Sequence, residues 1–188
     1  MAINLPTIPL GASTALKLLS SATDLRPYLG GPVQRVSRLG DRWRLDVQCR
    51  PMKFAQAMWF CASLIQGLSE KVVCAIPQPG LDLTGISDTT AVAAGSGGKT
   101  LVVAGGGTKI VGQYLSLVSG GVRYLHMVTA VAGNTLSIYP MLKVPIAGGE
   151  TVELLSPKIE GFLDGNEQGW TLGLVENIGL TFVIVEAQ

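Results

Sequence analysis

Short apolar segments separated by glycines occupy the second half of the sequence and restrict what the chain can fold into. Glycine pairs stand at Gly105-Gly106, Gly120-Gly121 and Gly148-Gly149, and β-branched residues are frequent between them. Segments of this length with tight turns and no helical spacing are typical of a small closed β-barrel. The sequence therefore predicts a five-stranded barrel over residues 86–156, with strands at Leu101–Ala104, Tyr114–Val118, Val122–Val131, Thr135–Tyr139 and Thr151–Leu155.

The segment before the barrel changes its period at Pro51. From Arg42 to Cys49 apolar and polar residues alternate, which indicates a half-buried strand. The turn residues Gly40-Asp41 predict a hairpin between this strand and Val33–Arg38. After Pro51 the apolar residues recur at steps of four and three, which predicts a helix over about residues 52–68 with an inner stripe of Phe54, Met58, Cys61, Ile65 and Leu68. Phe60 falls on the opposite side beside polar residues, and we interpret it as a contact residue.

Three apolar segments after Pro157 have no core of their own. They are Ile159–Leu163, Trp170–Leu174 and Leu180–Val185. We expect them to complete the sheet that begins before residue 77, because an inserted segment is tolerated when its ends lie close together at the surface. The predicted fold is mainly β, with a discontinuous domain of residues 1–85 and 157–188 and the barrel inserted at 86–156.

The charges are few but unevenly distributed. Charged residues make up 14% of the chain and the net charge is +1, which argues against a polyelectrolyte partner for nucleic acid. Seven basic residues lie between Arg26 and Lys53, whereas seven acidic residues lie from Glu150 onward. Opposite poles suit a head-to-tail contact between copies, although ordinary solvated faces explain them equally well. The predicted subunit interface comprises Arg35, Arg38, Arg42, Arg44, Phe60, Glu160, Asp164 and Glu176.

The motifs that suggest chemistry are incomplete. Gly95–Thr100 reads G-S-G-G-K-T, but Ala93 replaces the first glycine of a phosphate-binding loop and a strand follows in place of a helix. A glycine turn before a barrel strand is the better interpretation. His126 is the only histidine, with no recognisable nucleophile or orienting carboxylate near it in the sequence. We therefore predict no catalytic residue, no metal site and no cofactor.

The remaining features concern compartment and nucleic acid. Cys49, Cys61 and Cys74 lie in apolar segments without close spacing, which favours synthesis in a reducing compartment. Residues 1–10 lack the basic start of a signal peptide, and no apolar run has the roughly 18 residues that a membrane span requires. The arginines around Trp43 point away from it by alternation, so they do not form a stacking platform for bases; a phosphate-facing patch remains an alternative.

Several runs give the sequence a resemblance to a known family. They are residues 31–43 (GPVQRVSRLGDRW), the helix opening at Pro51, Tyr124-Leu125-His126, residues 136–142 (LSIYPML) and residues 157–163 (PKIEGFL). With the overall layout, they resemble the distal tail proteins of long-tailed bacteriophages. The resemblance implies a tail-tube-like β-sandwich with one flanking helix and an inserted barrel of the oligonucleotide/oligosaccharide-binding type. It also implies a ring of six copies in the virion tail that joins the tail tube to the baseplate hub, surrounds the channel and has no catalytic residues.

Two other functions compete with this one. The first is another tail component of similar build, such as a tube or terminator subunit. The second is a free binding module whose barrel holds a carbohydrate or single-stranded nucleic acid, for which exposed aromatic residues are needed; the barrel offers mainly Tyr114, Tyr124 and Tyr139. An enzyme is the least favoured class.

Overall fold

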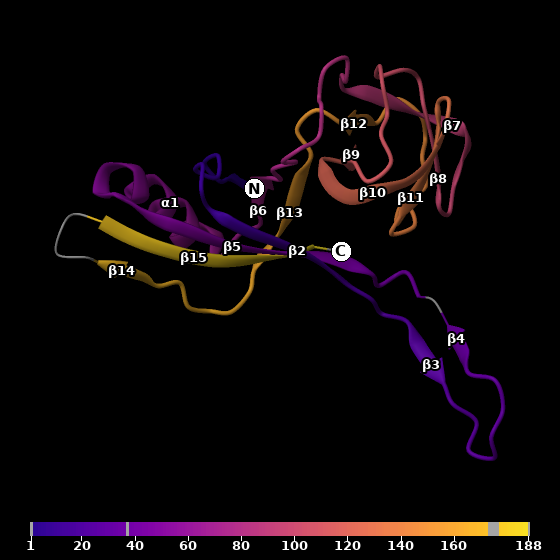
Figure 1. The fold of residues 1–188 in the computed structure, drawn as a ribbon, viewed down its shortest axis with the longest axis horizontal. Coiled ribbons are helices and arrows are strands. Elements are labelled where there is room, and N and C mark those ends of the chain that lie inside the picture. Colours follow the sequence, from indigo (N-terminus) through magenta and orange to yellow (C-terminus); the bar gives the residue numbers. More distant parts are fainter. Residues whose placement is uncertain (1, 37, 173–176, 188) are drawn as a thin grey trace.

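The protein is mainly β and has three visible parts. The computed structural model describes residues 2–36, 38–172 and 177–187, and within these ranges it contains a single helix. Figure 1 shows a curved sheet that carries the helix, a barrel beside it, and a narrow arm that projects away from both. The buried residues gather in two clusters, one between sheet and helix and one inside the barrel.

Seven strands from the two ends of the chain form one sheet. Its order is β1-β6-β13-β15-β5-β2, with β14 also paired to β15. The strands that follow residue 157 pair directly with those before residue 77, β13 with β6 and β15 with β5. The bounds are β1 (Ile3–Asn4), β2 (Ser13–Leu19), β5 (Arg42–Lys53), β6 (Val72–Ala75), β13 (Lys158–Leu163), β14 (Trp170–Leu172) and β15 (Asn177–Glu186).

Strand β5 runs further than the sequence suggested. It passes through Pro51 and ends at Lys53, where the helix α1 (Phe54–Gly67) begins. The pairing of β5 with β15 shifts register between Ile178 and Leu180, which places Pro51 in an irregular part of the ladder. A proline is tolerated at a bulge because no regular ladder hydrogen bond is required of it there.

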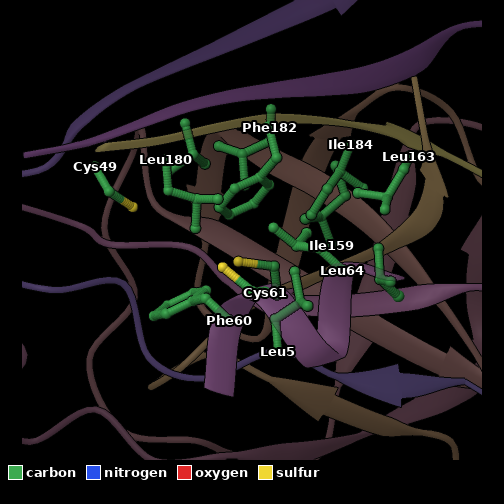
Figure 2. Packing of buried hydrophobic residues seen from close by; sticks show 14 of the residues in the cluster. Leu5, Cys49, Phe60, Cys61, Leu64, Ile159, Leu163, Leu180, Phe182 and Ile184 are labelled. Atoms are coloured by element: carbon green, nitrogen blue, oxygen red, sulfur yellow. The ribbon is translucent and has the colours of Figure 1, made fainter. Parts of the chain in front are cut away.

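The helix buries a different face from the predicted stripe. Ala57, Phe60, Cys61, Leu64 and Gly67 are buried, whereas Phe54, Met58, Ile65 and Leu68 are 43–53% exposed. The expected exposure of Phe60 is therefore wrong: its ring packs beside Phe182 of β15, with centroids 6.3 Å apart (Figure 2). A Cβ on Gly67 would lie 2.5 Å from Cγ1 of Val72, so this face is the one that allows close approach to the sheet.

The two facing sheets of a sandwich are not formed by the described residues. One face of the single sheet is covered by α1 and by the N-terminal segment through Leu5 and Ile8. The opposite face of β2 and β5 carries Lys17, Arg42 and Arg44, which favour water. The helix thus takes the place of a second sheet.

The barrel has six strands, one more than predicted. Its closed order is β10-β11-β8-β7-β12-β9, and all of its pairings are antiparallel. The unexpected strand is β7, a stretch of small residues in which Ala91 is the buried apolar one. Backbone pairing with β8 and β12 holds this strand in the barrel. Its sequence therefore needs no regular alternation of apolar and polar residues. The bounds are β7 (Thr89–Gly97), β8 (Thr100–Val103), β9 (Tyr114–Ser119), β10 (Val122–Ala132), β11 (Thr135–Tyr139) and β12 (Thr151–Glu153).

The arm replaces the hairpin that was expected at Gly40-Asp41. Strand β4 (Gln34–Val36) pairs with β3 (Thr23–Leu25) and not with β5, so the chain leaves the sheet after β2 and returns to it at the start of β5. Asp41 is held at the base of the arm: one carboxylate oxygen accepts the backbone N–H of Ser21 at 2.7 Å and the other accepts the hydroxyl of Tyr139 at 2.7 Å.

Candidate interaction surfaces

The outer face of the sheet carries a charged cluster that is largely neutralised within the chain. Arg44 donates from Nε to Asp46 at 2.8 Å, and its Nη1 lies 2.8 Å from Oδ2 of Asp164. Lys17 also donates to Asp46. Hydrogen bonds from Lys17 and then from Arg44 lower the pKa of Asp46. Arg44 and Asp164 were predicted for opposite poles of a contact between copies, but here they meet each other.

The acidic residues near the barrel are also engaged inside the chain. Glu160 is only 3% exposed, and its Oε2 accepts the backbone N–H of Arg123 at 3.0 Å. Glu153 lies between Arg123 and Lys158, whose Nζ is 2.9 Å from Oε1 of the carboxylate. The prediction that Glu160 faces a neighbouring copy is therefore wrong, because the barrel covers it.

Glu186 is the centre of the contact between sheet and barrel. Its carboxylate is fully buried and accepts the backbone N–H of Trp43 at 3.0 Å and that of Leu125 at 2.9 Å. The Nζ of Lys143, whose side chain is 8% exposed, lies 3.0 Å from the same carboxylate. The indole N–H of Trp43 donates to the carbonyl of Leu125 at 3.0 Å. The acidic pole read from the sequence thus joins two parts of one chain.

The basic residues at the base of the arm remain accessible. Arg35 lies 3.5 Å from Asp24 across the arm, and its side chain is 67% exposed. Arg38 and Arg42 are exposed and form no ion pair with a carboxylate in the described ranges. Glu176 lies outside the described residues. Of the eight residues predicted for an interface, Arg35, Arg38 and Arg42 are the ones that a neighbour could contact without breaking an internal network.

The outer side of α1 is apolar and uncovered. Trp59 is 74% exposed, Phe54 51% and Met58 45%, and no residue of the helix is charged. Several large apolar side chains exposed together on one element usually mark a surface that another element or molecule covers. Sequence reasoning missed this surface because it assigned one apolar stripe; the absence of any charge from Phe54 to Gly67 was the available signal.

The arm carries a second uncovered apolar surface. Tyr28 is fully exposed and Leu29 is 93% exposed, and they lie at the tip between β3 and β4. Other exposed apolar residues continue along both strands towards the sheet: Leu25, Val33, Val36 and Leu39. Prolines and glycines interrupt this part of the sequence, so no period pointed to it.

The residues that suggested catalysis or ligand binding in the sequence lie in a turn or in the buried core. The G-S-G-G-K-T segment covers the end of β7, the turn at Gly98-Lys99 and the first residue of β8, which confirms the glycine turn before a barrel strand. His126 is fully buried with Nδ1 2.8 Å from the carbonyl oxygen of Pro140, and burial lowers its pKa to about 4. The three cysteines are free and buried, and burial raises the pKa of each thiol. Within the described ranges no three His, Cys, Asp or Glu side chains are grouped as a metal would require.

The described part of the chain contains no helix with the length and apolarity needed to span a membrane. Comparison of the sequence with models of protein families and with curated proteins finds no match.

Proposed function

We propose that this chain is a structural subunit of a long-tailed bacteriophage, the distal tail protein that forms a ring between tail tube and baseplate in the virion. The proposal rests on the sequence resemblance and on one structural observation, the open edge of the sheet at β2. Neither catalysis nor a cofactor is part of the proposed role. The partners are other copies of the chain, six in the closed ring, together with the tail tube protein and the baseplate hub.

The open edge of β2 supports a protein that is completed by its own copies. β2 stands last in the sheet order, so its outer edge pairs with no strand among the described residues. This strand has seven residues, of which only Lys17 is charged. An exposed edge of this kind is a template for another strand, and soluble proteins usually cover or blunt it. Copies that pair in a closed ring use the edge in every subunit.

The barrel differs from the sheet in this respect. All six of its strands have two neighbours, so it has no edge to offer. We assign it the role of the peripheral oligonucleotide/oligosaccharide-binding-type barrel implied by the resemblance, and the sheet with α1 the role of the tube-like unit. Glu186 and Lys143 would hold the barrel rigidly against the sheet within each subunit of the ring.

The barrel tyrosines argue against the free binding module. The ring of Tyr114 packs edge-on against Trp43 with centroids 5.7 Å apart, and Tyr124 packs partly buried against the barrel core. Tyr139 is half-buried and donates to Asp41. A surface for stacking bases or sugars needs several exposed rings side by side.

Electron microscopy of the full chain, purified with the tail tube protein, tests the proposal. We expect single six-membered rings that cap one end of the tube. Long tubes built from this chain alone would identify a tube subunit, and binding to glycan arrays or oligonucleotides at physiological salt without any ring would support the binding module; either result contradicts the proposal.

The charged face offers a narrower test of the interface. Arg42→Glu reverses an exposed charge that has no internal ion pair among the described residues, so it disturbs a contact between copies without breaking an internal one. Lys99→Glu, the same charge reversal on the exposed turn between β7 and β8, is the control, and its thermal unfolding midpoint is measured as well because Lys99 lies 5.0 Å from the centre of the Tyr139 ring. We expect fewer rings for Arg42→Glu alone. Equal ring formation by both variants would remove Arg42 from the interface.

A further inference from the structure

The two uncovered apolar surfaces lie at opposite ends of the same strand. The arm leads into the first residue of β5, and α1 follows its last residue. A strand of the 12 residues of β5 is about 40 Å long at 3.3 Å per residue. Figure 1 shows the arm projecting away from the end of the sheet that carries α1. The arm therefore cannot cover the helix of its own chain.

We propose that the arm of one copy packs against the outer side of α1 in the next copy. The arm surface consists of Leu25, Tyr28, Leu29, Val33, Val36 and Leu39, and the helix surface of Phe54, Met58, Trp59 and Ile65. This inference deepens the proposed ring and rests on it for the identity of the partner. Because one surface of each copy meets a different surface of its neighbour, the contact is heterologous and generates a closed ring or a filament.

The properties of the arm favour a second copy as the occupant. The arm leaves the sheet at the end of β2, so it starts beside the open edge that the proposed function assigns to a neighbour. A two-stranded hairpin is at best marginally stable in water, and its apolar side chains gain from a surface that excludes water. The residues 20–41 are also as numerous as one side of a standard interface, which takes about 20–30 residues.

The helix surface fits the arm in chemistry. Trp59 and Phe54 are large, rigid and exposed, and aromatic residues with this exposure are the usual anchors of protein interfaces. The helix carries no charge that a contact would have to desolvate. Arg26 and Arg38 on the arm lie outside the apolar set and form no ion pair with a described carboxylate, so they can stay at the solvated rim.

Complementary variants of the full chain test the contact. Leu29→Glu blocks the arm and leaves the helix intact, whereas Trp59→Glu blocks the helix and leaves the arm intact. We expect each variant alone to self-associate at least about 30-fold more weakly than the wild type, or about 2 kcal/mol. A 1:1 mixture retains one good arm and one good helix surface, so it should form a 1:1 heterodimer that cannot grow further. Analytical ultracentrifugation and native mass spectrometry measure both results.

The control is Val111→Glu, an exposed apolar residue of the barrel region that is 59% accessible. It should assemble like the wild type, and the thermal unfolding midpoint of all three variants should confirm that they are folded. A wild type that stays monomeric at the highest attainable concentration overturns the inference. So does a Leu29→Glu protein that still assembles, which would indicate a helix-to-helix contact, or a mixture that yields no heterodimer.

Cross-linking places the two surfaces against each other directly. Leu29→Cys and Trp59→Cys are mixed and oxidised; the native thiols are buried, so they should not compete. We expect a disulfide-linked dimer in this mixture and none when Val111→Cys replaces either partner. Rings that form equally well with both blocked variants would refute the arm contact while the proposed function stands. Tubes in place of rings would refute the proposed function even if the cross-link forms.

Discussion

The barrel and the arm are both β-structures, but the barrel buries its apolar residues and the arm exposes them. The barrel closes on itself, so every strand has two neighbours, and residues such as Leu117 and Leu136 are fully buried. The arm is a single hairpin whose apolar residues face water, from Leu25 to the completely exposed Tyr28. Closure lets the barrel satisfy its backbone and its core without a partner, whereas a hairpin of two short strands cannot do so. The comparison separates what this chain needs to fold from what it offers to another molecule.

The attachments of the two regions differ in the same way. The barrel is fixed to the sheet through the buried Glu186, whose carboxylate meets Lys143 and two backbone N–H groups. Among the described residues, the hydrogen bonds that hold the arm to the rest of the chain lie at its base, where Asp41 accepts from Ser21 and Tyr139. We therefore expect the barrel to unfold together with the sheet and the arm to contribute little to the free energy of unfolding.

Removing the buried carboxylate should have the largest effect. Glu186→Ala leaves Lys143 and the N–H groups of Trp43 and Leu125 without their acceptor in a buried place, which should cost about 3–5 kcal/mol of the free energy of unfolding. Urea titration followed by tryptophan fluorescence measures the loss. Asp164→Ala is the control, because the ion pair of Asp164 with Arg44 is partly exposed and Arg44 keeps its second partner, Asp46. We expect this variant to lose about 0–1 kcal/mol of the free energy of unfolding. Equal losses would mean that Glu186 does not join the two parts.

A pair of leucine truncations compares the two regions directly. Leu117→Ala removes methyl groups from the closed barrel core and should cost about 3 kcal/mol through lost burial and a cavity. Leu29→Ala removes the same groups from a side chain that is 93% exposed, and should change the free energy of unfolding of the monomer by less than about 0.5 kcal/mol. If Leu29→Ala is costly in dilute solution, the arm folds against its own chain and the contrast is false.

Acid should act on the barrel through His126. Its pKa falls to about 4 in the folded chain because burial disfavours the imidazolium, and Lys143 nearby adds to this effect. The unfolded chain binds the proton near the ordinary pKa of about 6.5, so it gains protons first as the pH falls. The stabilisation is fully present above pH 6.5 and is lost progressively down to about pH 4, with a loss of about 2 kcal/mol between pH 8 and pH 5.

Substitution of the histidine isolates that contribution. His126→Gln should flatten the dependence of the free energy of unfolding on pH between 8 and 5, whatever its effect on stability at pH 8. The carboxyl groups of Asp41 and Asp46 have lowered pKa values, so they titrate below this window and stay unchanged in the variant. An equally steep dependence without His126 would place the acid sensitivity elsewhere in the chain.

Much of the barrel could be predicted from the sequence because glycine pairs mark several of its turns. The Gly120-Gly121 pair separates β9 from β10 at the expected place. β7 escaped because alanine, glycine and serine give a strand no apolar period, and its position depends on partners far along the chain. The spacing of apolar residues cannot predict a strand whose position is set by backbone pairing and not by side-chain burial.

The interaction surfaces were harder to predict than the fold. Spacing placed Phe60 outside and Phe54 inside, yet large apolar residues occupy more than one side of α1, and the side that packs on the sheet is the one that contains Phe60 and Gly67. The charge poles were real in the sequence, but distance along the chain does not reveal that Arg44 meets Asp164 or that Glu160 lies under the barrel. Arg42 stayed exposed, as the alternation of its strand indicated.

The smallest expected effect comes from two glycines with the same backbone demand. Gly120 in the barrel turn has φ +59° and Gly30 in the arm has φ +78°, and a Cβ at either position would meet no atom within 4 Å. Alanine at each site therefore introduces only the strain of a left-handed backbone, about 1 kcal/mol. Gly120→Ala should lower the free energy of unfolding by that amount, because the barrel turn forms in the same cooperative step as the core. Gly30→Ala should leave the free energy of unfolding unchanged, because the arm can open while the rest of the chain stays folded. For the same reason, amide hydrogens of residues 20–36 should exchange fast in the wild-type monomer. A loss of about 1 kcal/mol for Gly30→Ala as well would make the arm part of the cooperative unit.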